Sequence, residues 1–289
     1  MNDFLLSILL GVVEGLTEFL PVSSTGHLRI VEALFNLNLH DSFWKMYTIV
    51  IQLGAILALP VYFWNRILKF LGTFPKGERG DRNVLTHPLS LTMIAFVVTA
   101  APAWALTKVI GKNLESLWVI SLSLLIGGVV MWIVDATFTR PRVTQMEEMN
   151  LWQSIWIGAC QILSAVFPGT SRSMSTIAAG QIAGLSRPAA LEFSFFLSMP
   201  TMVVATLYDL YKTLKPTRDT ISEGGIAPLA VDSHGWIVLA IGFIVSFIVA
   251  LAVVAWFMNW VRSRGFTPFA IYRIALGIVL IILLMRGSI

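Results

Sequence analysis

The sequence predicts an all-α integral membrane protein with six transmembrane helices and two re-entrant helical hairpins arranged as an inverted-topology repeat. The first observation behind this prediction is composition: the 289 residues are 56% hydrophobic and only 12% charged, with a mean hydropathy of +0.79. Soluble domains carry about 25% charged residues. The second observation is a set of long apolar segments, and the third is two shorter apolar segments that polar residues and proline interrupt. The net charge of +4 gives no argument for nucleic-acid binding.

Six apolar segments approach the roughly 20 residues that a helix needs to cross a hydrocarbon core of about 30 Å. These segments are residues 45–64, 89–108, 116–134, 192–210, 235–261 and 267–285. The loop after the first segment carries five basic residues: Arg66, Lys69, Lys76, Arg79 and Arg82. Positive charge favours the cytoplasmic side, so this loop is expected there. Residues 42–45 and 217–222 are then expected on the extracytoplasmic side, opposite residues 77–83.

Two further apolar segments, residues 4–20 and 151–167, look too short or too polar to be ordinary spans. Pro21 and Pro168 end them, because proline interrupts a helix. Each proline is followed by a turn rich in serine and threonine and by a second short apolar piece. We therefore expect re-entrant hairpins at residues 4–35 and 151–183, since broken backbone at membrane depth is tolerated where protein or a water-filled cavity surrounds it.

The two predicted hairpins align with each other at an offset of 147 positions. The alignment places Ser7, Ile8, Gly11, Leu16, Pro21 and Ser24 on Ser154, Ile155, Gly158, Leu163, Pro168 and Ser171, and Glu14 on Gln161. Each hairpin precedes three predicted spans, and three is odd, so the second half should be inverted. The sequence thus predicts one membrane domain of two repeats, residues 1–149 and 150–289, with a functional site where the broken helices meet.

The first hairpin turn concentrates ionisable and hydroxyl side chains, which in a membrane segment indicate function. Glu14 and Glu18 are four residues apart, so on a helix they share a face. Two carboxylates that close in a low dielectric need a cation or a basic partner. Ser23, Ser24 and Thr25 suit the N-cap of a following helix, whose N-terminus would favour an anion.

The second hairpin turn adds a permanent positive charge. Arg172 lies in the run PGTSRSMST at residues 168–176, and its planar fork suits bidentate contact with phosphate. If the turns meet, Arg172 should face Glu14, Glu18 and His27. That combination suits phosphoryl chemistry, in which catalysis is mostly positioning and charge stabilisation. The residues leave open whether Ser24, His27 or water is the nucleophile, and Ser24 could serve only as a helix cap.

The runs EGLTEFLPVSSTGH at residues 14–27 and PGTSRS at residues 168–173, with Thr176 beyond it, resemble the two signature motifs of the bacterial undecaprenyl-diphosphate phosphatases, the bacitracin-resistance family. The resemblance covers essentially the whole chain in length and element order. It implies a membrane hydrolase that converts undecaprenyl diphosphate to undecaprenyl phosphate and inorganic phosphate. Such an enzyme recycles the lipid carrier for peptidoglycan synthesis and confers bacitracin resistance. The resemblance also implies a multi-pass protein of the bacterial inner membrane whose active site opens to the extracytoplasmic side.

The resemblance also implies roles for particular residues. The implied catalytic residues are Glu14, Glu18, Ser24, His27 and Arg172. Glu14 and Glu18 would also hold a divalent cation, Mg²⁺ or Ca²⁺. Predicted contacts to the substrate phosphates come from Ser23, Thr25, Ser171, Ser173 and Thr176. The expected partners are a polyprenyl diphosphate and membrane lipids, without nucleic acid, and the sequence leaves homodimerisation and the preferred prenyl length open.

Two other interpretations compete with this one. A secondary transporter or polyprenyl-phosphate flippase would also have inverted repeats, with glutamates that carry protons. Against it stands the concentration of serine, histidine and arginine, which is more than ion coupling needs. An acid lipid phosphatase is disfavoured because its Lys/Arg-Pro, Ser-Gly-His and His-Asp motifs do not occur in order. Arg273 lies inside the last predicted span, where the sequence does not decide between a role at the site and snorkelling to an interface.

Overall fold

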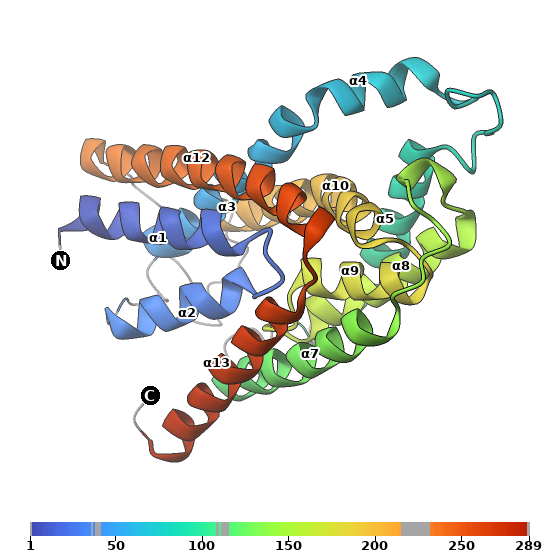
Figure 1. The fold of residues 1–289 in the computed structure, drawn as a ribbon. Helices are drawn as coiled ribbons and strands as arrows, with labels where there is room; N and C mark the ends of the chain where they lie inside the picture. Colours follow the sequence, from blue (N-terminus) through green and yellow to red (C-terminus); the bar gives the residue numbers. More distant parts are fainter. Residues whose placement is uncertain are drawn as a thin grey trace.

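The computed structural model describes residues 2–35, 37, 42–107, 110, 116–214 and 232–287. This part of the chain is predominantly helical and has no strand beyond an isolated bridge between Val143 and Leu185. In chain order the helices (Figure 1) are α1 Asp3–Thr17, α2 Ser24–Leu34, α3 Ser42–Tyr62, α4 Trp64–Thr73, α5 Pro88–Ala105, α7 Leu117–Thr137, η1 Met146–Glu148, α8 Leu151–Val166, α9 Arg172–Ile182, α10 Arg187–Leu214, α12 Ser233–Ser263 and α13 Thr267–Met285. The all-α prediction is confirmed.

Six of these helices are long and apolar enough to cross a membrane: α3, α5, α7, α10, α12 and α13. The chain is therefore a multi-pass membrane protein, as the composition predicts. The largest difference in bounds is at α10, which begins at Arg187 rather than at residue 192. Ser186 accounts for the earlier start, because its Oγ accepts a hydrogen bond from the amide of Ala189 and so caps the helix. The predicted extracytoplasmic residues 217–222 lie outside the described residues.

Helix α4 occupies part of the connection that follows the first predicted span. It begins at Trp64, and only Phe63 separates it from the end of α3 at Tyr62. The amide of Ile67 donates to the carbonyl of Phe63, so the backbone stays nearly helical across the junction. Arg66 and Lys69, two of the basic residues of the predicted loop, are thus held on a helix that leaves the bundle at an angle (Figure 1).

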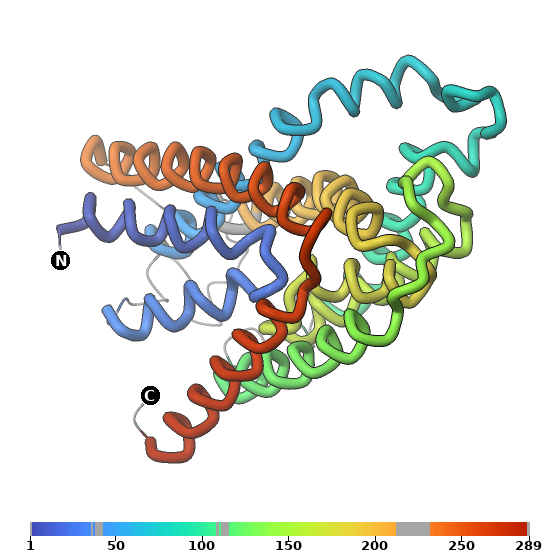
Figure 2. The backbone as a smooth tube through the Cα atoms, in the orientation of Figure 1, coloured from blue at the N-terminus to red at the C-terminus, as the bar shows by residue number. Residues whose placement is uncertain are grey.

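Both predicted hairpins form as helix–turn–helix units. Helix α1 reverses into α2 through residues 18–23, and α8 reverses into α9 through residues 167–171, as Figure 2 shows for the blue first hairpin. The first helix ends three residues before the predicted limit at residue 20, with Glu18 as its C-cap. Whether the hairpins enter a membrane without crossing it stays a prediction.

The two halves of the chain make equivalent contacts 147 positions apart. Ser7 Oγ of α1 donates to the carbonyl of Val238 on α12 over 2.7 Å, and Ser154 Oγ of α8 donates to Leu91 on α5 over 2.5 Å. Glycines 147 positions apart also let each hairpin helix approach its partner helix closely. A Cβ on Gly11 would lie 2.9 Å from the carbonyl oxygen of Gly242, and one on Gly158 would lie 2.5 Å from that of Ala95. The inverted repeat stays a prediction, and these equivalences support it.

The turns themselves differ by one residue, so the alignment of Ser24 with Ser171 is wrong there. The N-caps of the second hairpin helices are Ser23 and Ser171, which are 148 apart. Counted from the aligned prolines, Ser171 lies three residues after Pro168, whereas Ser23 lies two residues after Pro21. This longer step includes Gly169, whose φ of +94° is accessible mainly to glycine. A Cβ on Gly169 would collide with the backbone of Ile120 on α7. The second turn therefore needs glycine both for its backbone conformation and for close packing.

A cluster of buried phenylalanine rings fixes the end of α1. The ring of Phe19 packs edge-on against Phe195 of α10 with centroids 5.5 Å apart, and Phe195 in turn lies 6.1 Å from Phe63. All three side chains are buried. Because Phe19 follows Glu18 directly, this packing holds the backbone that directs Glu18 towards the second hairpin.

Candidate active site

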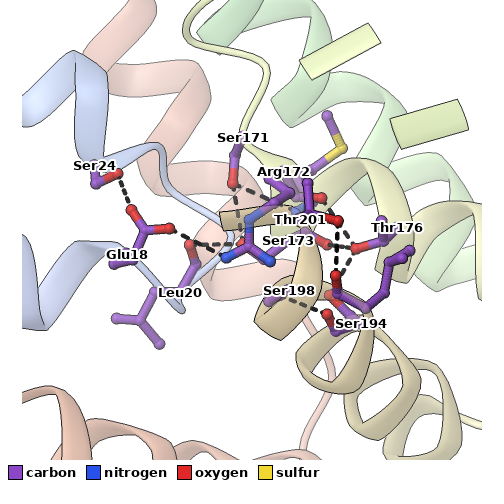
Figure 3. A network of polar contacts seen from close by, with 12 residues as sticks. Glu18, Leu20, Ser24, Ser171, Arg172, Ser173, Thr176, Ser194, Ser198 and Thr201 are labelled. Carbon is purple, nitrogen blue, oxygen red and sulfur yellow. Dashed lines mark hydrogen bonds and ion pairs between the residues drawn. The ribbon is translucent and has the colours of Figure 1, made fainter. Parts of the chain in front are cut away.

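Glu18 joins the two hairpin turns. Its Oε2 accepts a hydrogen bond of 2.5 Å from Ser24 Oγ, and its Oε1 accepts one of 3.1 Å from Arg172 Nη2 (Figure 3). Its side chain is only 8% exposed, so the ion pair with Arg172 is largely shielded from water. The prediction that Arg172 of the second hairpin faces a carboxylate of the first is confirmed.

Two strained serines direct both helix N-termini to this point. Ser23 has φ of 74° and Ser171 has φ of 71°, a left-handed conformation that costs a residue other than glycine roughly 1–3 kcal/mol. Each side chain accepts a hydrogen bond from the backbone amide three residues later, as an N-cap does. Ser24 and Arg172 are the first residues of α2 and α9. The partial positive charges of two helix N-termini therefore reinforce the guanidinium in attracting an anion.

Glu14 is fully buried one turn before Glu18. In the described part of the chain, neither of its carboxylate oxygens has a hydrogen-bond partner, and the same holds for Arg172 Nη1. A buried carboxylate or guanidinium group left unpaired is costly. In this place Glu14 could hold a cation, and Arg172 Nη1 could hold an anion.

The hydroxyls of the second turn are mostly engaged within the protein. Ser173 Oγ donates to the carbonyl of Leu20 over 3.0 Å and lies 3.1 Å from Ser171 Oγ. Thr176 Oγ1 lies 2.6 Å from Ser194 Oγ on α10. These bonds (Figure 3) tie the second turn to the first turn and to α10. Two of the predicted phosphate contacts, Ser173 and Thr176, thus form hydrogen bonds within the protein. A third, Thr25, lies half-buried in the first turn of α2.

His27 is held away from the Ser24 hydroxyl. Its Nδ1 lies 2.7 Å from the carbonyl oxygen of Ser23, which can only accept, so Nδ1 carries the proton. Its Nε2 lies 2.6 Å from the hydroxyl of Tyr272 on α13, and the two rings stack with centroids 5.6 Å apart. Among the described residues no hydrogen bond joins His27 to Ser24 or Arg172.

The sequence does not decide the role of Arg273. In the structure its side chain donates hydrogen bonds to the backbone of both turns. It is fully buried, and its guanidinium donates to the carbonyls of Pro21 (3.1 Å), Gly169 (3.0 Å) and Ser123 on α7 (3.1 Å). A Cβ on Gly127 would collide with the guanidinium, so this glycine leaves the space that the arginine fills. Arg273 does not snorkel, and it adds a fixed positive charge behind the turns.

We expect Arg273→Met to destabilise the protein and to lower its activity together. The methionine keeps much of the volume but leaves the buried carbonyls of Pro21 and Gly169 without a donor, whereas the carbonyl of Ser123 keeps its bond within α7. Each unsatisfied group costs about 1–3 kcal/mol. Thermal unfolding in detergent should show a lower Tm, while Arg286→Met at the exposed end of the same helix should not change it. A wild-type Tm and wild-type activity in Arg273→Met would contradict this role.

The fold and these turns define a class: a polytopic membrane protein in which two helix N-termini, an arginine and two glutamates meet at a buried centre. The family described as "Bacitracin resistance protein BacA" matches residues 7–279. The chain belongs to this family.

Curated relatives agree over nearly the full length. A protein of Koribacter versatilis (strain Ellin345) named undecaprenyl-diphosphatase is 64% identical over 282 residues, which cover 97% of this chain and 98% of the relative. Relatives with the same name come from Bradyrhizobium sp. (strain ORS 278), 41% identical with complete coverage of both chains, and from Caldanaerobacter subterraneus subsp. tengcongensis, 38% identical with 99% and 98% covered. These names favour the phosphatase interpretation over the transporter or flippase.

Proposed function

We propose that this chain is an undecaprenyl-diphosphatase that hydrolyses undecaprenyl diphosphate to undecaprenyl phosphate and inorganic phosphate. The observation that carries the proposal is the Glu18 carboxylate, which contacts both a candidate nucleophile, Ser24, and a candidate phosphate ligand, Arg172. Family membership and the names of the relatives support the same activity.

The geometry favours Ser24 as the nucleophile and Glu18 as its base. Ser24 Oγ would attack the terminal phosphorus while its proton passes to Glu18 Oε2, and the phosphoanhydride bond to the lipid phosphate would break. Undecaprenyl phosphate leaves, and water then hydrolyses the phosphoserine to release inorganic phosphate and restore the hydroxyl. General-base catalysis requires this hydrogen-bond distance between base and proton. His27 is less suited to the base role, because Ser23 and Tyr272 occupy its two nitrogens.

Arg172 would bind the diphosphate through the part of its fork that Glu18 does not use. Its Nη2 donates to Glu18, while the buried Nη1 has no partner among the described residues. A phosphate oxygen at Nη1 would satisfy that donor and receive a charge-assisted hydrogen bond. Developing negative charge on the transferred phosphoryl group would then meet a preorganised cation.

The residues present also fit a divalent cation, Mg²⁺ or Ca²⁺. Both oxygens of Glu14 are buried without a partner, and Glu18 lies one helical turn away. The described residues contain no cluster of three or more acidic, histidine or cysteine ligands. Mg²⁺ is commonly held by one or two carboxylates together with substrate phosphates and water, so two carboxylates suffice. When bound, the cation would neutralise diphosphate charge next to Glu14 and Glu18.

We further propose that the protein resides in the bacterial inner membrane with this site open to the extracytoplasmic side. The basic residues between Arg66 and Arg82 support a cytoplasmic location for that end of α4. In this place the enzyme would recycle the lipid carrier of peptidoglycan synthesis. It would also confer bacitracin resistance, as the family's description suggests.

The activity is tested by phosphate release from undecaprenyl diphosphate with purified protein in detergent. We expect turnover without any membrane gradient, and a fall of at least about tenfold when a chelator removes divalent cations. Activity that returns with added Mg²⁺ or Ca²⁺ would support Glu14 and Glu18 as ligands. No phosphate release from a well-folded preparation would reject the proposed function, and full activity with chelator would reject the cation.

A further inference from the structure

Exposed apolar side chains continue from the membrane helix α3 onto α4, across the turn residue Phe63. Leu57 and Val61 lie on one face of α3, and Trp64, Leu68 and Leu71 lie on one face of α4, at intervals of four and three residues. All five side chains are exposed, with Trp64 57% and Leu71 58% exposed. Exposed apolar residues on a membrane span face lipid, and this apolar stripe extends that surface beyond the span.

The opposite face of α4 is fastened to the protein. Arg66 Nε donates to Glu192 of α10 over 2.7 Å, and both terminal nitrogens of Arg66 donate to the carboxylate of Glu147 in η1 over 2.5 and 2.7 Å. The Arg66 guanidinium also lies 4.6 Å above the ring of the buried Phe70. Because this face is fixed, α4 cannot rotate to bury its stripe against the bundle.

The position of α4 matches the edge of a membrane. It starts two residues after the end of the α3 span, and its partner Glu147 belongs to the polar connection between α7 and α8. Figure 1 shows α4 leaving the helix bundle at an angle rather than continuing along it. A helix in this place meets both hydrocarbon and water.

The charge of α4 and of the loop that follows it favours anionic lipid. Five basic and two acidic residues lie between Arg66 and Arg82. Arg66 is paired with Glu147, and Lys69 forms an ion pair with Glu78. Lys76 and Arg79 are exposed next to the end of the helix. Exposed cations next to an amphipathic helix attract anionic headgroups.

We propose that α4 is an interfacial helix that lies on the bilayer surface, with Trp64, Leu68 and Leu71 in the acyl chains and Lys76 and Arg79 on anionic phospholipid headgroups. This surface is independent of the hairpin turns and of their chemistry.

The test uses a Cys160→Ser background, since Cys160 is the only cysteine. A fluorescent nitrobenzoxadiazole label is attached to Leu71→Cys or, as the matched control, to Asn65→Cys, which is exposed on a different face of α4. The full-length protein is reconstituted at one copy per nanodisc. Lipid-borne nitroxide and aqueous iodide are compared as quenchers, with and without phosphatidylglycerol.

We expect the ratio of nitroxide to iodide quenching at Leu71→Cys to exceed that at Asn65→Cys by at least about threefold with phosphatidylglycerol present. In phosphatidylcholine alone, or with Lys76→Glu and Arg79→Glu, the ratio should fall towards that of the control. Equal ratios at the two positions would overturn the interfacial helix. A Leu71→Cys label shielded from both quenchers would show that protein covers the stripe instead. A high ratio that does not depend on phosphatidylglycerol would overturn the assignment of anionic lipid.

Discussion

Glu18→Gln is expected to lower kcat for phosphate release by about 10²- to 10⁴-fold with little change in folding. The amide keeps the shape of the side chain but can no longer take the proton from Ser24, and it cannot pair ionically with Arg172. Since Glu18 contacts both groups, its replacement should lower kcat more than the loss of any turn hydroxyl other than that of Ser24, the proposed nucleophile. Purified enzyme assayed at saturating undecaprenyl diphosphate gives kcat directly.

Glu32→Gln supplies the matched control. Glu32 is another buried glutamate of the first hairpin, 3% exposed, and it bonds to Arg29 rather than to either turn. Its variant should keep turnover within a few-fold of wild type. If Glu18→Gln turned over as fast as Glu32→Gln, the catalytic base would have to lie elsewhere.

Arg172→Ala is expected to lower kcat by about 10²- to 10³-fold, or roughly 2.7–4 kcal/mol, because one preorganised donor to the transferred phosphoryl group is lost. It should also raise KM, because the unpaired Nη1 is the atom we assign to the diphosphate. Arg172→Lys keeps the charge without the planar fork, so it should recover only part of this activity.

The turnover of wild type, Arg172→Ala and Arg172→Lys should be compared at matched Tm and matched elution in detergent. Differences in turnover then do not come from differences in folding. Wild-type turnover in Arg172→Ala would make the second hairpin a scaffold, and the mechanism with two hairpins would be wrong. Full recovery in Arg172→Lys would mean that charge alone, without bidentate geometry, explains the role of residue 172.

The sequence predicts the main helices and the meeting of the two turns because these features leave local patterns. Long apolar runs mark the spans, and prolines followed by serines mark the turns. The contact of Arg172 with Glu18 could be anticipated because a buried arginine and a buried carboxylate each require a partner.

Other features leave no such pattern. Arg273 binds only backbone carbonyls, which every residue has. No particular side chain in the sequence therefore indicates its partners. The hydrogen bond from Tyr272 to His27 joins positions 245 apart, and tyrosine near a span end suits an aromatic belt equally well. The one-residue difference between the turns depends on the conformation of Ser23 and Ser171, which composition does not encode. Helix α4 could have been found from the spacing of Trp64, Leu68 and Leu71.

The equivalent contacts of the two hairpins have a consequence for the biogenesis of the protein. Helix α1 packs on α12, and α8 packs on α5, so each hairpin is buried by a span from the other half of the chain. The hydrogen bond from Ser7 to Val238 joins residues 231 apart. At a synthesis rate of roughly 5–20 residues per second, α1 leaves the ribosome on the order of 10–50 s before its partner exists. Glu14 and Glu18 must therefore be accommodated in a nascent chain that has no α12 yet. The amino-terminal half should reach its native state only when the carboxyl-terminal half arrives, whether on the same polypeptide or as a separately expressed fragment.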